Sequence, residues 1–293
     1  SVHLKFGGVV PELASRAHQK TITQTVEQAL EEAGVSIENI EAVAVTQGPG
    51  LLGSLLVGIC FAKGLALSRN IPLIGVNHMD AHIYANFIDH EPEFPLISLT
   101  VSGGHTQLVH VKSTFDHEII GETRDDAAGE AFDKIGKLLG LPYPAGPHMD
   151  KLAKEGDPKF HEFPQALLHK GLDFSFSGLK TSVLYYLQEK EDECIEDHLN
   201  DICASVSFAI AEVLVKKLKK AIQKTGVKTV LLAGGVSANS MLREKAEQMA
   251  DEMGVNLYSP KISYCTDNAA MIAITGKMKA ERGQFDDLDM VPV

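Results

Sequence analysis

The sequence has few of the features that mark secreted or membrane proteins. Among its 293 residues are only four cysteines, at positions 60, 194, 203 and 265, and no two form a C-x-x-C pair. This sparse usage favours buried, reduced thiols in a cytoplasmic protein over a disulfide framework. No apolar run reaches membrane-spanning length and no signal peptide is recognisable, so we expect no membrane partner.

Positive charge is also in deficit. The chain has 27 Lys and Arg against 39 Asp and Glu, a formal net charge of −12. Such a surface repels phosphate backbones, so the chain alone should bind nucleic acid poorly without a local basic patch or a partner protein. No short repeat or low-complexity tract is present. A hydrophobic content of 44% argues against disorder, and the length suggests two domains.

Hydrophobic periodicity and turn residues predict an α/β protein with a parallel sheet and crossover helices. The first domain is expected over 1–94 and the second over 95–293, starting at a strand, Gly-Gly turn and strand that read as a hairpin. The last helix is expected to pack back on the first lobe. The expected elements are helix 10–33, strand 40–46, helix 51–68, strand 72–76, a helix from 78, the hairpin, helix 201–225, strand 229–233, the following helix, strand 255–258 and helix 266–274.

His78 and His82 lie one helical turn apart in N-H-M-D-A-H, so both imidazoles can reach one ion. By themselves they are more often two ordinary surface histidines. Asp267 is a candidate third ligand because it opens the last helix, with Thr266 as an expected cap, although an acidic residue there is common in any case. A His₂-carboxylate set suits zinc or ferrous iron, and the sequence does not separate the two metals.

Two glycine turns follow predicted strands. Ser102, Gly103, Gly104 and His105 join the hairpin strands, and residues 234–239 join a strand to a helix. Glycine lets backbone N–H groups approach a phosphate or sugar, but tight-turn geometry alone also requires it. The pair favours nucleotide binding. Neither turn fits G-x-G-x-x-G or G-x-x-x-x-G-K-[ST], which disfavours Rossmann and P-loop assignments.

Two further motifs combine polar and small residues. In 125–134, Asp126, Glu130 and Asp133 recur at helical spacing, which suits either a solvated acidic face or a carboxylate that binds ribose hydroxyls. The stretch 175–181, S-F-S-G-L-K-T, is predicted as a turn. It either contacts substrate or is a plain loop, and the residues do not decide between these.

Taken together and in order, the motifs resemble one family across nearly the whole chain. The family is that of the tRNA N6-adenosine threonylcarbamoyltransferases, called TsaD in bacteria and Kae1 elsewhere, formerly described as sialoglycoprotein endopeptidases. Two of the motifs resemble the bacterial branch. The motifs are F-G-G-V-V-P-E-L-A-S-R-A-H, G-P-G-L-L-G-S-L-L-V-G, N-H-M-D-A-H, V-S-G-G-H-T-Q-L, D-D-A-A-G-E-A-F-D-K, F-S-F-S-G-L-K-T, A-G-G-V-S-A-N and C-T-D-N-A-A-M.

The resemblance implies an actin/Hsp70/sugar-kinase-like (ASKHA) two-lobed α/β fold. It implies transfer of a threonylcarbamoyl group from threonylcarbamoyl-AMP to N6 of the adenosine 3′ of the anticodon, in tRNAs that read ANN codons, with release of AMP. It also implies the protein partners TsaB and TsaE. One divalent metal per subunit, iron or zinc with magnesium as a third option, maps onto His78, His82 and Asp267. The implied adenylate-binding residues are Val101, Ser102, Gly103, Gly104, His105, Asp133, Gly146, Asp150 and Asn239.

One part of the family pattern is not found. Members begin with a strand and turn of the G-I-E-T-S-C-D-E-T kind, which does not precede Ser1, and the tail stops at M-V-P-V, short of the usual end. The resemblance therefore predicts an N-terminal lobe without its first hairpin.

Three other functions share some of these features. A zinc peptidase is disfavoured because Met79 stands where H-E-x-x-H has its glutamate base. An ATPase or kinase of the same fold would turn over ATP without modifying tRNA. A nucleotide-sensing scaffold would need no metal. In the transferase, we expect the metal to act as a Lewis acid, His105 to orient a phosphate, and adenine N6 to attack directly without a covalent enzyme intermediate.

Overall fold

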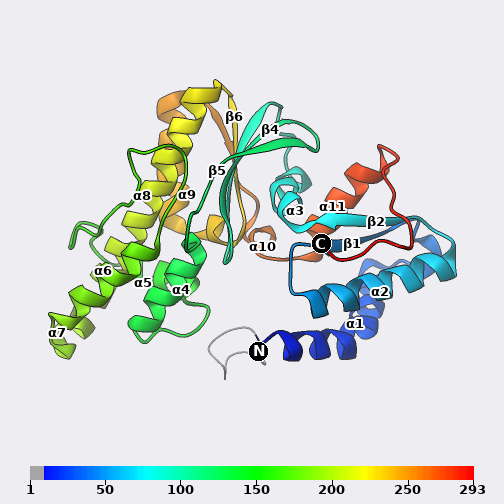
Figure 1. The fold of residues 1–293 in the computed structure, drawn as a ribbon, viewed down its shortest axis with the longest axis horizontal. Coiled ribbons are helices and arrows are strands. Elements are labelled where there is room, and N and C mark those ends of the chain that lie inside the picture. The colour runs from blue at the N-terminus through cyan, green and yellow to red at the C-terminus, as the bar shows by residue number, and fades with distance from the viewer. Residues whose placement is uncertain (1–9) are drawn as a thin grey trace. The chain divides into compact units, whose positions relative to one another are not determined.

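The computed structural model describes residues 10–293, and the chain divides into two compact units (Figure 1). The first joins Ser1–Ile88 to Asn268–Val293, and the second is Asp89–Asp267. The sequence suggested a boundary between residues 94 and 95 with a returning last helix, whereas this division runs between 88 and 89 and assigns the last helix to the first unit. The start of the F-G-G-V-V motif and the expected absence of a first hairpin concern residues outside those described.

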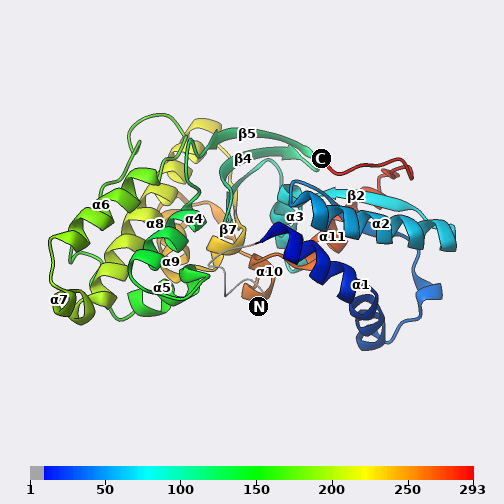
Figure 2. The same cartoon turned by 60° about the horizontal axis from the view of Figure 1, so that its bottom comes forward.

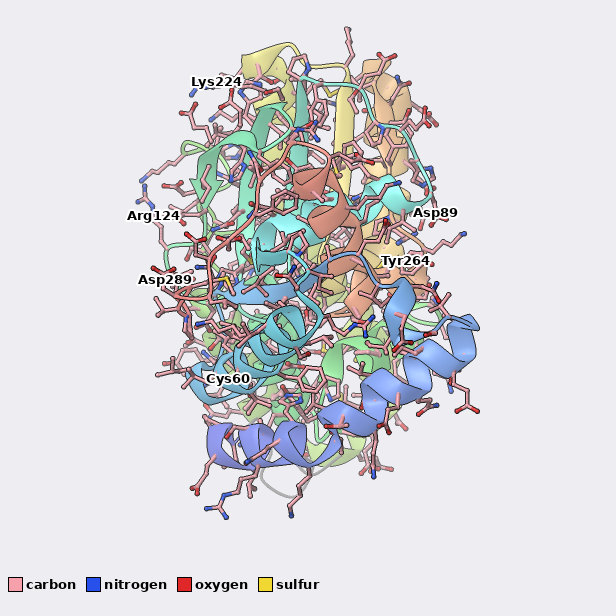
Figure 3. The ribbon with its side chains drawn as sticks, turned by 90° about the vertical axis from the view of Figure 1, so that its right-hand side faces the viewer. Cys60, Asp89, Arg124, Lys224, Tyr264 and Asp289 are labelled. Carbon is pink, nitrogen blue, oxygen red and sulfur yellow. The ribbon has the colours of Figure 1, made fainter. Side chains whose placement is uncertain are left out.

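The first unit is built on two parallel strands joined by a crossover helix. Strands β1 and β2 pair in register from Val43 opposite Leu73, and a helix connects them, as parallel pairing requires. Helix α2 covers one face of the pair, and α11 packs on the other face (Figures 1 and 3). The elements are α1 (Pro11–Ala33), η2 (Ile37–Asn39), β1 (Val43–Gly48), α2 (Leu52–Arg69), β2 (Leu73–Asn77), α3 (His78–Tyr84), η3 (Ala85–Ile88) and α11 (Ala269–Ala280).

Helix α2 is unusually apolar and little buried. Its 18 residues have a mean hydropathy of 1.4, so by length and composition this helix could cross a membrane, although the sequence was expected to contain no such run. A crossover helix of an α/β unit can meet the same criterion, and one such helix is weak evidence for a membrane. Only 17% of its residues are buried. Cys60 lies exposed on this helix (Figure 3), and Cys194 is half-buried, so the expectation of four buried thiols is wrong for these two.

The second unit contains a mixed five-stranded sheet in the order β5-β4-β3-β6-β7. The two hairpin pairings are antiparallel, and β6 is parallel to both of its neighbours. Figure 2 shows the long helix α8 among the other helices of this unit. The elements are β3 (Leu96–Val101), β4 (Thr106–Ser113), β5 (Asp116–Glu122), α4 (Ala128–Leu138), α5 (Ala145–Ala153), α6 (Ser177–Gln188), α7 (Asp192–Asp197), α8 (Leu199–Thr225), β6 (Thr229–Ala233), η4 (Gly235–Ala238), α9 (Ser240–Met253), β7 (Asn256–Tyr258) and α10 (Ile262–Cys265).

Strand β3 is the centre of this sheet and carries the candidate loop at its end. All six of its residues are buried, which fits a strand flanked on both sides by others. Ile97 and Leu99 alternate onto the face that joins the main core with α8. The hydroxyls of Ser98 and Thr100, on the other face, share a hydrogen bond of 3.1 Å. The strand that leads to the candidate loop is therefore buried on both faces.

The predicted helices and strands are confirmed in type, and several boundaries and one motif differ. The helix at His78 begins as predicted, because the Asn77 side chain accepts from the N–H groups of Met79 and Asp80 at 2.8 and 3.2 Å. Strand β5 was not foreseen. The predicted turn over 175–181 is wrong, because helix α6 begins at Ser177 and includes most of this stretch.

Candidate active site

The helix after β2 brings His78 and His82 together. Helix α3 starts at His78, so His82 follows one turn later on the same face. The two ring centroids lie 4.7 Å apart and the rings meet edge to face. His82 is buried and His78 is half-buried. One imidazole pair is thus presented by the first turns of a short, capped helix.

Asp267 joins this pair from the far end of the sequence. It directly precedes Asn268, whose side chain accepts from Met271 N–H at 2.9 Å and caps α11, the helix that packs along α3. The predicted cap at Thr266 is wrong because the cap of α11 is Asn268, two residues later. One ligand atom from each of His78, His82 and Asp267 lies within 4.8 Å of the others. Two ligands at about 2.1 Å from one ion are at most about 4.2 Å apart, so small side-chain adjustments suffice.

The glycine turn after β3 is closed by two reciprocal hydrogen bonds. Ser102 N–H donates to the His105 carbonyl at 2.8 Å, and His105 N–H donates to Ser102 Oγ at 3.1 Å. Gly103 and Gly104 are exposed, and a side chain on either would meet nothing within 4 Å. The open side of the turn has room for a ligand.

Two other glycines bring neighbouring elements against the end of β3. A methyl group on Gly129, in the first turn of α4, would overlap the Ser102 carbonyl and the Gly103 Cα. A methyl group on Gly234 would overlap the Val101 carbonyl, and its φ of 84° is one that other residues rarely adopt. The first turn of α4 and the loop after β6 therefore touch the candidate loop directly.

Asp133 and Asp150 extend these contacts to α5 and α9. Asp133 Oδ1 accepts from Ala145 N–H at 2.7 Å, at the start of α5. Burial raises the pKa of Asp133, although the N–H groups of Ala145 and Gly146 oppose the rise. Asp150 Oδ1 accepts from both N–H and Oγ of Ser240, each at 2.8 Å. Each carboxylate thus binds the start of a neighbouring helix.

Asn239 stands at the start of α9, next to the residue that Asp150 holds. Its Oδ1 accepts from Leu242 N–H at 2.9 Å, so the side chain caps α9 while only 9% exposed. One continuous series of contacts in the second unit therefore links Val101–His105, α4, α5 and Asn239. The sequence named these residues, but their mutual contacts were not predictable from it.

A family model described as "TsaD: tRNA N6-adenosine threonylcarbamoyltransferase" matches residues 1–274. The chain belongs to this family. Its motifs predicted that membership, which is confirmed, and with it a transferase that modifies tRNA as the class of enzyme.

Named relatives support this assignment, whereas the solved structures show a similarity of fold alone. Proteins named tRNA N6-adenosine threonylcarbamoyltransferase from Christiangramia forsetii and Riemerella anatipestifer are each 52% identical, covering 99% and 98% of this chain and 87% and 86% of their own lengths. The crystal structure of full-length HypF in a phosphate- and nucleotide-bound form is similar in fold, with a TM-score of 0.65 at 15% identity. It covers 90% of this chain, which spans 42% of HypF. The crystal structure of T.kodakarensis HypF has a TM-score of 0.63 at 15% identity. The match covers 87% of this chain and 42% of that HypF chain.

Asp125, in the family motif D-D-A-A-G-E, makes hydrogen bonds that were not predicted from the sequence. Asp125 accepts from Ser175 Oγ at 2.5 Å and from Phe176 N–H at 2.8 Å. It also accepts from Ser177 N–H and Oγ at 3.2 and 3.0 Å. Asp125 thus fixes the start of α6 from a distance of fifty residues in sequence, and it occupies the N–H groups there.

The expected acidic face of this motif is only partly formed. Helix α4 begins at Ala128, so Asp126 precedes the helix instead of sharing its face. Asp126 and Glu130 both pair with Lys134, at 2.7 and 2.9 Å. Asp133 alone of the three predicted carboxylates contacts the neighbouring helix α5.

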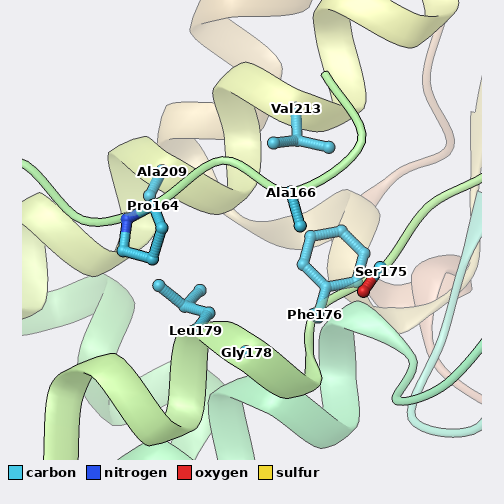
Figure 4. A pocket seen from close by; sticks show the side chains of 8 residues that line it. All are labelled: Pro164, Ala166, Ser175, Phe176, Gly178, Leu179, Ala209 and Val213. Carbon is cyan, nitrogen blue, oxygen red and sulfur yellow. The ribbon is translucent and has the colours of Figure 1, made fainter. Parts of the chain in front are cut away.

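A small apolar pocket lies elsewhere in the second unit. Figure 4 shows its lining side chains, which come from α6, α8 and the segment before α6. Phe176 and Leu179 face it, and Ser175 stands at its edge. None of the predicted metal or adenylate residues line it.

Proposed function

We propose that this chain transfers the threonylcarbamoyl group of threonylcarbamoyl-AMP to N6 of the adenosine 3′ of the anticodon in tRNAs that read ANN codons. The carrying observation is that Asp267 lies with His78 and His82, which are far from it in sequence, in a chain of this family. In the reaction, a bond forms between N6 and the carbamoyl carbon, the bond to the phosphate oxygen breaks, N6 gives up one proton, and AMP leaves.

His78, His82 and Asp267 would hold one divalent cation. Two imidazole nitrogens and one carboxylate oxygen suit zinc or ferrous iron, whereas magnesium prefers oxygen ligands throughout. When bound, the cation would supply Lewis-acid polarisation of a substrate oxygen. His82, being buried, would be the more rigid of the two histidines.

The contact series in the second unit would hold the adenylate. The turn after Val101 is open at Gly103 and Gly104, and the backbone N–H groups of these two glycines would suit a phosphate there. His105 would orient that phosphate. Asp133 and Asp150 each use one oxygen for a helix start, and a carboxylate can accept several hydrogen bonds, so ribose hydroxyls can bind as well. Gly146 and Asn239 complete the proposed set.

We propose that the fold is of the actin/Hsp70/sugar-kinase type, with lobes corresponding to the two compact units. The mixed sheet of the second unit and the likeness to HypF support this assignment. We further propose a cytoplasmic location, which suits an enzyme with tRNA as substrate.

TsaB and TsaE are the proposed protein partners. Leu52, Leu56 and Leu67 lie on one stripe of α2 and are 64%, 43% and 68% exposed. An apolar stripe of this kind suits a protein partner, and we assign it to TsaB. The net charge of −12 further suggests that partners contribute basic surface for tRNA.

Reconstitution tests the function. The chain is combined with TsaB, TsaE, threonylcarbamoyl-AMP and an ANN-reading tRNA, and the tRNA nucleosides are read by mass spectrometry. A variant with both His78→Ala and His82→Ala should lose bound metal and product. His117→Ala, at an exposed histidine of β5, is the matched control and should keep both. Full transfer by the metal-free double variant would contradict the assignment.

A further inference from the structure

Arg243 joins two segments that each lead to a proposed site residue. It lies in the first turn of α9, and its Nε donates to the Ser237 carbonyl at 2.6 Å. Its Nη2 donates to the Pro260 carbonyl at 2.7 Å and to Cys265 Sγ at 3.3 Å. Nε carries one proton and Nη2 two, so these three bonds use all the protons on that edge of the guanidinium.

The two segments are those that position Asn239 and Asp267. Ser237 stands two residues before Asn239, and Cys265 stands two residues before Asp267. The same two segments also touch near Gly235, whose added methyl would lie 3.7 Å from Thr266 Cγ2. All of these residues belong to the second unit. A displacement of either segment must therefore strain the guanidinium bonds to the other.

The chemistry of these bonds favours arginine over lysine. All three acceptors are neutral, two carbonyl oxygens and one thiol sulfur, so a planar fork with directed donors holds them better than a single ammonium could. The buried Cys265 Sγ is itself within hydrogen-bonding distance of the Pro260 and Lys261 carbonyls, at 3.7 and 3.5 Å. The segment before Asp267 is thus folded around the Arg243 side chain.

We propose that Arg243 is a positioning residue that couples Asn239, a proposed adenylate-binding residue, to Asp267, a proposed metal ligand. Binding of a nucleoside beside Asn239 would stabilise the arrangement of Asp267 that accepts a metal, and metal binding would favour the nucleoside in return. This inference rests on the proposed function, because it takes both sites from it.

The coupling between binding of Zn²⁺ and binding of adenosine tests this role. Zn²⁺ affinity is measured with and without saturating adenosine, which has no phosphate to touch the metal, so any coupling passes through the protein. In the natural chain we expect adenosine to tighten Zn²⁺ binding at least about fivefold. In Arg243→Met, adenosine should change Zn²⁺ affinity by less than about twofold, while each probe still binds alone. Arg243→Lys should show an intermediate effect.

Lys245→Met is the matched control. Lys245 lies on the same helix but pairs with Glu212 of α8 at 2.7 Å, so its loss should leave the coupling intact. Circular dichroism melting establishes whether each variant is folded. If Arg243→Met does not fold, the coupling measured in Arg243→Lys decides the question. Undiminished coupling in the Arg243 variants, or no coupling in a natural chain that binds both probes, would overturn the inference. If the natural chain binds neither probe, the proposed site is wrong and the inference falls with it.

Discussion

Three aspartates of the second unit bind helix starts that lie 12 to 90 residues away in sequence. Asp125 holds α6, Asp133 holds α5 and Asp150 holds α9. The first N–H groups of a helix have no partner inside it, so a carboxylate from another element can satisfy them. These side chains therefore fix where neighbouring helices begin, in addition to any contact with substrate.

Gly129→Ala should disturb the candidate loop directly. The added methyl would overlap the Ser102 carbonyl, and we expect a loss of about 1–3 kcal/mol in the free energy of unfolding, with a raised KM for threonylcarbamoyl-AMP. Gly178→Ala is the control, because Gly178 has the same place in α6 and its added methyl meets nothing within 4 Å. Urea denaturation and steady-state kinetics measure the two effects. Equal behaviour of the two variants would contradict the close contact.

Asp125→Asn should flatten the acid dependence of stability. Burial alone would raise the pKa of Asp125, but hydrogen bonds from Ser175, Phe176 and Ser177 outweigh it and hold the pKa below its usual value. The stabilisation is therefore complete above the unfolded-state pKa of about 3.9 and is lost as pH falls through the lower folded-state value. At pH 7 the variant should be about 1–2 kcal/mol less stable, a gap that narrows below pH 4.

Urea midpoints from pH 7 to pH 2.5 measure this gap. Asp251→Asn, at an exposed carboxylate near the end of α9, is the control and should follow the natural chain. A gap between Asp125→Asn and the natural chain that stays constant with pH would refute the assignment of the hydrogen bonds to the ionised carboxylate.

At the scale of elements, α8 is the main support of the second unit. Most of its 27 residues are buried, including Lys217. The Lys217 ammonium donates to the carbonyls of Leu167, Lys170 and Gly171, in the segment before α6. Burial lowers the pKa of Lys217. The long helix thereby anchors a segment with no helix or strand of its own.

Lys217→Met should loosen that segment while leaving α8 formed. Methionine fills similar space but leaves three carbonyls without their donor, for an expected loss of about 1–3 kcal/mol in the free energy of unfolding. Trypsin should then cut after Lys170 several times faster than in the natural chain. Lys220→Met, at an exposed lysine of α8, should change neither stability nor cleavage. Unchanged cleavage in Lys217→Met would show that other contacts hold the segment.

At the scale of the whole molecule, the apolar stripe on α2 is the clearest proposed contact surface. Leu56→Glu places a charge in that stripe without removing a buried side chain, so the melting temperature should change little. Binding to TsaB, measured by isothermal titration calorimetry, should weaken at least about tenfold, since a charge would be buried without a partner. Glu41→Gln, at an exposed residue before β1, is the control. Undiminished TsaB binding by Leu56→Glu would place the partner elsewhere.

The local parts of the fold and site were predictable from the sequence. The spacing of His78 and His82 after the Asn77 cap, the hairpin around Gly103, and the strand, loop and helix around Asn239 all follow from periodicity and turn residues. Each depends on residues a few positions apart, over which backbone geometry is nearly fixed. The family resemblance then supplied the identities of the proposed metal and adenylate residues, which remain predictions.

Only the tertiary structure decided how these pieces meet. The approach of Asp267 to the histidine pair, the binding of Ser240 by Asp150 and the Arg243 bonds join residues that lie far apart in the chain or on different elements. Helical or strand periodicity reports which face of an element is buried, but not which other element covers it. The sequence therefore determined the ligand types and their local geometry, while packing of the elements around β2 and β3 decided which of them converge.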